Sequence, residues 1–432
     1  MSTIPWTRSL ACSALAVLTA VSAAIADDAP PNTLTPAERT AGWTLLFDGT
    51  TSNGWRGYKK DAFPTTGWTI EDGCLRIGKG GGDIITVGQY GDFDFTFEWK
   101  ATPAANSGVI YRVTEIHDAP WMTGPEYQVL DDGGYGAAAD EPHSAGALYD
   151  LAAPAEGKKL NPAGAWNQGR IRLENGRLRH WLNGMKIVDV RVDDQTWTDR
   201  IDWSKFKAYP GFGVQPKGHL ALQDHGDEVC YRNLKVRDLS KPMPGERALF
   251  DGKDLTGWTA VLPNGGKMED VWSVRDGILV CTGNPVGYIR TNDDFTNYVL
   301  KLQWRFNPVT GKAGNSGVLL RKIGPDKVWP KSVEAQLHSG NAGDFWNIDE
   351  FQMTTDTERT NGRNTRKTHF AENPIGQWND YEIIVDGGDV VLLVNGEEVN
   401  RATNVQEIPG KICLQSEGAE IQFRNVRLAE VK

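Results

Sequence analysis

Short stretches of strictly alternating apolar and polar residues dominate this chain. One runs over 93–99, where Phe or Trp fills every second position, and another over 298–304 repeats that spacing. A period of two puts the apolar side chains on one face of a β-strand and the polar ones on the other. Asn-Gly pairs at 183–184 and 395–396 mark tight hairpin turns. With almost no helical period beyond a short entry at 36–39, the pattern predicts an all-β chain of sandwich type.

The same motifs occur twice along the chain, in the same order. Leu-Phe-Asp-Gly at 46–49 returns at 249–252, and Asn-Ser-Gly-Val at 106–109 returns at 315–318. Repeated blocks in a fixed order indicate a duplicated structural unit. We therefore predict two tandem β-sandwich domains, 40–239 and 246–432, joined by a short linker that contains two prolines.

The first 26 residues differ from the remainder of the chain. A polar start with Arg8 is followed by an apolar run that ends in Ala-Ile-Ala at 24–26. Small residues at these positions are read by signal peptidase, so we predict a signal peptide at 1–26 and a periplasmic or secreted protein. The run is shorter than about 18 residues, and no later stretch is apolar enough, so we expect no membrane span.

The cysteines and the net charge limit the possible disulfides and partners. The mature chain keeps Cys74, Cys230, Cys281 and Cys413. In an exported protein these either pair as 74–230 and 281–413 or remain free buried thiols. The formal net charge is −10. An acidic chain repels phosphate backbones and anionic lipid, so we expect no nucleic-acid partner.

Strand alternation also selects the polar side chains that leave the core. Tyr127 and Val129 are expected to point inward, which sends Glu126 and Gln128 to the opposite face. The second copy repeats this arrangement at 333–338. We interpret the outward set as a polar binding cluster, against the alternative of weak surface ion pairs. The cluster comprises Asn106, Arg112, Glu126 and Gln128 in the first copy, and Asn315, Arg321, Glu334, Gln336 and His338 in the second.

The two copies differ at a late turn. The first has Asp-His-Gly at 224–226, where the second has Ser-Glu-Gly at 416–418 and so lacks the histidine. His225 is the strongest histidine candidate because it follows an aspartate between two strand-like runs. Three tryptophans without a counterpart, Trp121, Trp329 and Trp346, are expected in loops, where a flat ring can stack on a sugar. Trp55, Trp68, Trp166 and their copies are predicted to be core residues.

No common hydrolase motif is present. The chain has no G-x-S-x-G, H-E-x-x-H or P-loop. It also lacks the Glu-x-Asp-x-x-Glu run of sandwich-type β-glucanases, so paired carboxylates for ordinary glycoside hydrolysis are not visible on one strand.

The repeated motifs, taken together, resemble a known family. They include Leu-Phe-Asp-Gly…Gly-Trp, Asn-Ser-Gly-Val…Arg, Glu-Tyr-Gln-Val-Leu-Asp, Gly-Ala-Leu-Tyr at 146–149, Leu-Gln-Asp-His-Gly and the closing Arg-Asn-Leu. This set resembles the DUF1080 family, also called the 3-keto-disaccharide hydrolase or 3-keto-glucoside 1,2-lyase/3-keto-2-hydroxyglucal hydratase domain. Both copies match. The resemblance implies concanavalin A-like jelly-roll sandwiches and a carbohydrate substrate, namely a glycoside already oxidised at C3.

The implied chemistry fits the missing carboxylate pair. A ketone at C3 acidifies the C2 proton, so one base can start β-elimination of the C1 substituent, and water then adds to the enone. We expect Glu126 or His225 to be the base, with Asn106, Arg112 and Gln128 on sugar oxygens and the enolate. Asp131 is a further substrate-binding candidate. A divalent metal would polarise the ketone, with Glu126, Asp131 and His225 as candidate ligands, although no ligand spacing demands one.

Both the role of the second copy and the function of the whole chain stay open at this point. The second copy, with Asn315, Arg321, Glu334, Gln336, His338 and Trp346 as substrate-binding candidates, is either a second active site or a non-catalytic sugar-binding copy. The whole chain could instead be a lectin-like double module that binds plain glycans. A third alternative is an interaction protein that uses two sandwiches as a scaffold.

Overall fold

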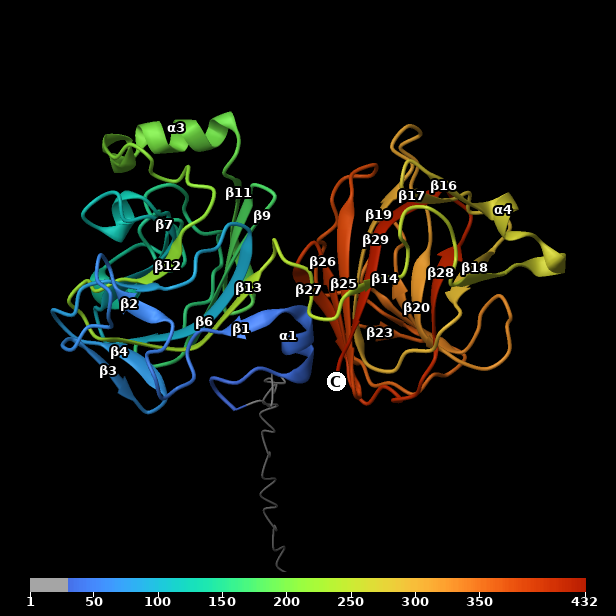
Figure 1. The fold of residues 1–432 in the computed structure, drawn as a ribbon, viewed down its shortest axis with the longest axis horizontal. Helices are drawn as coiled ribbons and strands as arrows, with labels where there is room; N and C mark the ends of the chain where they lie inside the picture. The colour runs from blue at the N-terminus through green and yellow to red at the C-terminus, as the bar shows by residue number, and fades with distance from the viewer. Residues whose placement is uncertain (1–29) are drawn as a thin grey trace, which may run out of the picture. The chain divides into compact units, whose positions relative to one another are not determined.

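The computed structural model describes residues 30–432, and Pro31–Lys432 form one compact unit (Figure 1). The predicted signal peptide at 1–26 lies outside the described residues. Within residues 30–432, the regular structure is mainly strand, and 29 strands form four antiparallel sheets. This confirms the predicted all-β class. The expected helical entry is α1 (Pro36–Ala41), whose first turn is closed by a capping box between Thr35 and Glu38.

The first copy, blue to green in Figure 1, is a sandwich of two sheets. The larger sheet has the order β11 (Met185–Arg191), β10 (Arg177–Leu182), β9 (Asn167–Glu174), β6 (Phe93–Ala101), β13 (Val229–Asp238), β4 (Cys74–Ile77) and β3 (Trp68–Glu71), with β1 (Trp43–Leu45) beside β13. The smaller sheet has the order β2 (Trp55–Gly57), β5 (Ile84–Thr86), β12 (His219–Leu222), β7 (Asn106–Val113) and β8 (Glu126–Leu130).

The second copy, yellow to red in Figure 1, repeats this arrangement. One sheet has the order β16 (Trp272–Arg275), β17 (Ile278–Cys281), β29 (Ile421–Glu430), β19 (Tyr298–Phe306), β25 (Asn379–Asp386), β26 (Asp389–Val394) and β27 (Glu397–Ala402), with β14 (Arg247–Ala248) beside β29. The other has the order β15 (Trp258–Val261), β18 (Gly287–Thr291), β28 (Lys411–Ser416), β20 (Gly317–Lys322), β21 (Ser332–Gln336), β22 (Phe345–Ile348), β24 (Asn364–Thr365) and β23 (Thr360–Asn361).

Strand order in the two copies is the same, apart from additions at one edge. β2-β5-β12-β7-β8 in the first copy corresponds to β15-β18-β28-β20-β21 in the second. The second copy extends this sheet by β22, β24 and β23, whereas the first inserts α3 (Gln195–Trp203) and η2 (Lys205–Ala208) between β11 and β12. The two copies therefore share the strand framework and differ in their insertions. The predicted domain boundary falls between β13 and β14.

Each copy buries its own hydrophobic core between its two sheets. Phe93, Phe95, Phe97 and Trp99 of β6 are all buried in the first core. In β19 the equivalent side chains, which end at Trp304, fill the second core. The alternation that predicted strands thus also identified the buried faces, because only one face of each strand meets the opposite sheet.

The four cysteines within the described residues are free thiols. Cys281 lies on β17 and Cys413 on β28, which belong to different sheets. The free-thiol alternative is therefore the one observed in the structure. Burial raises the pKa of Cys281 to about 11, so the thiol rather than the thiolate is present near neutral pH.

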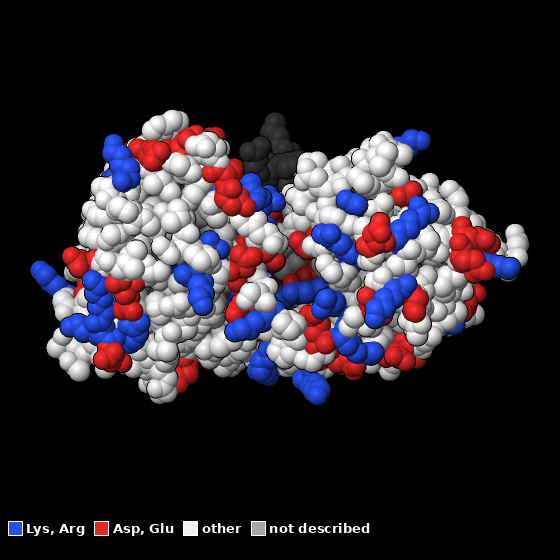
Figure 2. Space-filling view, turned by 45° about the horizontal axis from the view of Figure 1, so that its top comes forward, with Lys and Arg blue, Asp and Glu red and all other residues white. Residues whose placement is uncertain are grey.

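The surface carries both signs of charge. On the face shown in Figure 2, acidic and basic side chains are interspersed between large uncharged areas. Among residues 30–432, no helix is long and apolar enough to cross a membrane.

Candidate functional site

A cavity of about 270 Å³ opens in the first sandwich over β7 and β8. Its floor comes from the two strands, and its rim comes from the β12–β13 turn and the inserted segment that contains η2. It is lined by Asn106, Trp121, Glu126, Gln128, Tyr149, Lys205, Gln223 and His225.

Glu126 lies at the base of this cavity. Tyr127 and Val129 enter the core as predicted, and the Tyr127 hydroxyl donates to the Trp181 carbonyl oxygen at 3.1 Å. This fixes the strand so that Glu126 faces the cavity, with only 5% of its surface exposed. Burial raises the pKa of Glu126 to about 8, and the nearby Lys205 ammonium opposes that rise. A carboxylate with this pKa is a competent base near neutral pH.

A chain of side chains links Glu126's strand to the histidine. The Gln128 amide Nε2 donates to Asn106 Oδ1 at 3.3 Å. Asn106 Nδ2 in turn lies 3.4 Å from Nε2 of His225. Oε1 of Gln128 is buried without a hydrogen-bond partner in the structure, so it is available to accept from a ligand hydroxyl. The predicted members Asn106, Glu126, Gln128 and His225 are therefore brought together.

Asp83, which the sequence analysis missed, holds the turn that carries His225. The Asp224 backbone N–H donates to Asp83 Oδ1 at 2.8 Å, and the Gly82 backbone N–H donates to Asp224 Oδ2 at 2.7 Å. Burial raises the pKa of Asp83 to about 6. Nothing in the local sequence singles out Asp83, which directly precedes β5, because its partner lies 141 residues away in the chain.

Lys205 is a second residue that sequence reasoning missed. It begins η2, and its backbone N–H donates to Asp150 Oδ2 at 3.0 Å. Its ammonium lies over two aromatic rings, 4.3 Å from the centroid of Tyr149 and 5.3 Å from that of Trp121. The first cavity thus combines one buried carboxyl group, one imidazole and one cation.

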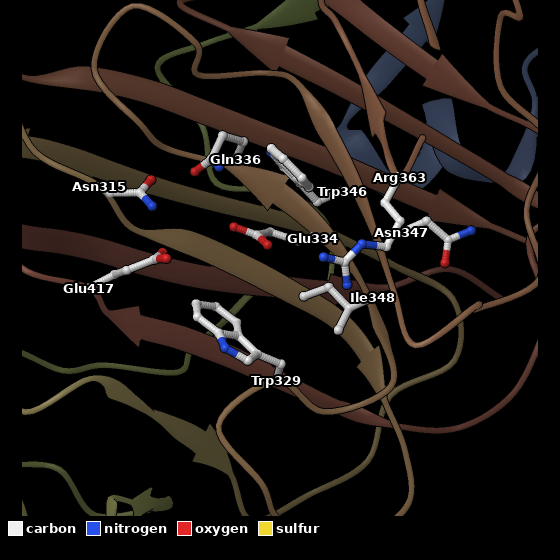
Figure 3. Close-up of a pocket in the computed structure, with 9 residues that line it drawn as sticks. All are labelled: Asn315, Trp329, Glu334, Gln336, Trp346, Asn347, Ile348, Arg363 and Glu417. Atoms are coloured by element: carbon white, nitrogen blue, oxygen red, sulfur yellow. The ribbon is translucent and has the colours of Figure 1, made fainter. Parts of the chain in front are cut away.

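The second sandwich has a cavity in the corresponding place, of about 300 Å³ (Figure 3). Asn315, Glu334 and Gln336 occupy the positions of Asn106, Glu126 and Gln128. The full lining is Asn315, Trp329, Glu334, Gln336, Trp346, Asn347, Ile348, Arg363 and Glu417.

Two carboxyl groups meet in this second cavity. Glu334 is 4% exposed, and burial followed by the proximity of Glu417 raises its pKa to about 8. Burial raises the pKa of Glu417 to about 7. Oε2 of Glu417 and Oδ1 of Asn315 are buried without a hydrogen-bond partner. In Figure 3 the carboxyl group of Glu334 points toward both of these residues.

Arg112 and Arg321 do not reach the cavities, contrary to the prediction. Both have a left-handed backbone, with φ of 54° and 48°, which interrupts the alternation that would have kept them on the outer face. Arg112 Nε donates to the Gly91 carbonyl oxygen at 3.2 Å. Arg321 donates to the carbonyl oxygens of Thr296, Gln406 and Gly387 and to Asn297 Oδ1. Each arginine therefore ties loops together, and neither lines its cavity.

Asp131 and His338 also lie outside the cavities. Asp131 Oδ2 accepts from the Ala104 backbone N–H at 2.9 Å. His338 follows the end of β21, is exposed, and lies 3.2 Å from Asn341 Nδ2 through its Nδ1. Within residues 30–432, no group of three or more His, Cys, Asp or Glu side chains could hold a metal ion. The suggested ligand set of Glu126, Asp131 and His225 therefore does not fit a metal.

The tryptophan predictions are partly correct. Trp55 and Trp68 are buried in the core, but Trp166 is only half-buried and lies under the Arg232 guanidinium, 4.0 Å from it. Trp121, Trp329 and Trp346 line the cavities as expected for stacking platforms. Trp346 belongs to β22 and Trp121 to the short helix η1 (Pro120–Met122), so neither is a loop residue.

The chain matches one protein family over both of its copies. The family model described as the 3-keto-alpha-glucoside-1,2-lyase-like domain matches residues 42–237 and 245–429. A 3-keto-disaccharide hydrolase of Bacteroides thetaiotaomicron is 34% identical over 230 residues, which cover 46% of this chain and 79% of that protein. A solved structure from Parabacteroides distasonis, described as a "putative glycosyl hydrolase", is 36% identical over 49% of this chain and all of that one, with a TM-score of 0.45.

Two sandwiches, each with a polar, aromatic-walled cavity, together with the family match over both copies, define a carbohydrate-active protein. More particularly, the chain belongs to the 3-keto-alpha-glucoside-1,2-lyase-like domain family, and it carries two copies of that domain. The resemblance noted in the sequence is thus confirmed.

Proposed function

We propose that the chain cleaves glycosides oxidised at C3, with Glu126 as the general base in the first sandwich. One observation carries this proposal. A single carboxyl group, nearly inaccessible to water and with its pKa raised to about 8, faces a cavity lined by sugar-binding side-chain types. Such a group suits removal of the weakly acidic proton next to a ketone, and it does not suit a glycosyl-enzyme mechanism, which uses two carboxyl groups.

The proposed reaction balances without an oxidant or reductant. Glu126 takes the proton from C2, and its electron pair passes into an enolate at C3. The C1–O bond then breaks, and His225 gives a proton to the departing oxygen. Water then adds its hydroxyl to C1 of the resulting enone and gives its other proton to His225, and the proton held by Glu126 returns to C2. The net result is hydrolysis.

The enolate requires nearby hydrogen-bond donors or positive charge. Lys205 and the Asn106 amide supply these in the first cavity, and the Trp121 and Tyr149 rings offer flat apolar faces for a pyranose. We infer that the protein works outside the cytoplasm, since the apolar run that ends at residue 26 has the form of a cleavable signal peptide.

The experiment is turnover by the mature chain. We would supply 3-keto-trehalose and trehalose separately and follow the release of 3-keto-glucose and of reducing sugar. In a Glu334→Gln background, which removes the corresponding carboxyl group of the second cavity, Glu126→Gln should lower turnover of the keto sugar by about 10²–10⁴-fold. The matched control is Glu71→Gln, the same chemical change at a surface position of β3, half exposed and paired with Arg76.

A non-catalytic glycan-binding module is the second candidate, and one observation favours it. Trp329 is 45% exposed at the rim of the second cavity, as a stacking platform would be. Binding of trehalose together with no turnover of either sugar would support this candidate and contradict the proposed reaction.

A further inference from the structure

We propose that the second sandwich holds a catalytic centre of its own, in which Glu334 is the base and Glu417 the acid on a 3-keto-glycoside. This inference rests on the proposed function of the first sandwich. It adds a second site. It also assigns a role to Glu417, which stands in the second copy where the first copy has His225.

Glu417 occupies the place of His225. Both follow the strand that pairs with the Asn-Ser-Gly-Val strand, β12 in the first copy and β28 in the second. Each is next to the asparagine that opens this motif: Asn106 Nδ2 lies 3.4 Å from His225 Nε2, and Asn315 forms a β-bridge with Glu417. The histidine of the first copy is therefore replaced in the second by another proton-transfer group, at the equivalent position of the fold.

The two carboxyl groups converge on one cavity. In Figure 3, Glu334 and Glu417 point into the space between the Trp329 and Trp346 rings. The buried Oε2 of Glu417 has no hydrogen-bond partner, although a buried carboxylate oxygen normally has one. A substrate oxygen placed between the two groups would supply that partner.

Both carboxyl groups also have a raised pKa. The pKa of Glu334 is raised to about 8 and that of Glu417 to about 7, in each case first by burial. A proton held by such a coupled pair belongs to both groups, so the roles of base and acid are assigned by position: Glu417 occupies the place of His225. The first cavity pairs the carboxyl group of Glu126 with the imidazole of His225.

A cation reaches each cavity from a different part of the fold. Lys205 comes from η2 of the insertion between β11 and β12, whereas Arg363 comes from the turn between β23 and β24. These segments do not correspond in the two copies. Arg363 and Glu334 both line the second cavity (Figure 3). Both copies thus complete the arrangement of base, acid and cation, the second by means of its own added strands.

The reaction at the second centre is balanced as follows. Glu334 takes the C2 proton, the C1–O bond breaks, and Glu417 gives its proton to the departing oxygen. Glu417, now a carboxylate, takes a proton from water as its hydroxyl adds to C1, and Glu334 returns the first proton to C2. Both carboxyl groups end in their starting states.

Turnover of 3-keto-trehalose by the full mature chain tests the inference. Glu126→Gln should retain measurable turnover, about tenfold or more above the double variant Glu126→Gln/Glu417→Gln. The control is Glu126→Gln/Glu398→Gln, which changes a surface glutamate of β27 paired with Arg401 and should match Glu126→Gln. Equal turnover in Glu126→Gln and Glu126→Gln/Glu417→Gln would overturn a catalytic role for Glu417.

A second measurement separates the two roles. In D₂O, the Glu126→Gln/Glu417→Gln variant should still exchange the C2 proton of the substrate for deuterium through Glu334, while the leaving group is released at least tenfold more slowly. The Glu126→Gln/Glu334→Gln variant should lose the exchange. Exchange that persists without Glu334 would refute its assignment as the base.

Failure of the proposed function of the first sandwich would give a different result from failure of this inference. If the unaltered chain turns over no keto sugar and exchanges no C2 proton, the proposed function falls. If it turns over keto sugar and Glu126→Gln abolishes all of it, the first centre stands and the second is refuted. Melting temperatures of all variants are compared with that of the unaltered chain, so that unfolding is not mistaken for lost chemistry.

Discussion

A β-carbon added to Gly108 would lie 2.2 Å from Oε1 of Glu126. In the pairing of β7 with β8, Gly108 is opposite Gln128 and Ile110 is opposite Glu126, so the glycine and the carboxyl group share the outer face. The second copy has the same relationship: a β-carbon on Gly317 would lie 2.4 Å from Oε1 of Glu334. The repeated Asn-Ser-Gly-Val motif therefore makes room for a buried carboxyl group on the neighbouring strand.

Replacement of Gly108 by alanine should displace Glu126 from its place in the cavity. We expect turnover by the first sandwich to fall about tenfold or more, because a shift of about 1 Å in a catalytic group is costly. The measurement is kcat/KM for 3-keto-trehalose in the Glu334→Gln background, which removes the second centre. Gly78→Ala is the control, since the nearest atom to its added methyl group would be 3.7 Å away. Unchanged kcat/KM in Gly108→Ala would contradict the steric argument.

The pH dependence of turnover follows from the raised pKa of Glu126. The base must be ionised, so kcat/KM of the first sandwich should rise with pH and level off above about 8. Below that value the slope should be close to tenfold per pH unit. The profile is measured between pH 5.5 and 9.5 in the Glu334→Gln background. A plateau that begins near pH 5 would mean that another group is the base.

The same pKa predicts an effect on stability. Below the usual pKa of a glutamate, near 4.5, Glu126 is protonated in both the folded and the unfolded chain. As pH rises, the unfolded chain loses this proton first, so ionisation favours unfolding until the folded group also ionises near 8. Glu126→Gln should therefore stabilise the protein by about 4 kcal/mol at pH 8 and leave it unchanged at pH 4.

Thermal melting at the two pH values checks this expectation. The control is Glu71→Gln, whose side chain is half exposed. A variant Glu126→Gln that melts below the unaltered chain at pH 8 would show that the carboxylate is stabilised by its surroundings, against the prediction.

Asp83 should matter through the position of His225. Asp83→Asn weakens the hydrogen bond that Asp83 Oδ1 accepts from the Asp224 backbone, because a neutral oxygen is a poorer acceptor. We expect kcat to fall about three- to tenfold with little change in KM, since the substrate contacts remain. Asp61→Asn, at an exposed position, is the control. A raised KM with unchanged kcat would indicate that Asp83 acts on substrate binding and not on the turn.

Strand-level features of this protein could be read from the sequence because they are local. The period of two at 93–99 and 298–304 identified buried faces that the structure confirms. The same reasoning sent Glu126, Gln128, Glu334 and Gln336 away from the core, and all four line the cavities. This reasoning failed at Arg112 and Arg321, where a left-handed backbone breaks the alternation. Because neither position is a glycine, the sequence gives no sign of this conformation.

The sequence alone determined the duplicated all-β architecture and which strand residues could bear chemistry, since alternation and repetition are properties of neighbours along the chain. Only the tertiary structure decided what surrounds those residues. Lys205 enters the first cavity and Arg363 the second from insertions without a common pattern, and Asp83 meets its partner 141 positions later. Contacts of that kind depend on how the sheets and loops pack, and packing also supplies the burial that raises the pKa of Glu126 and Glu334.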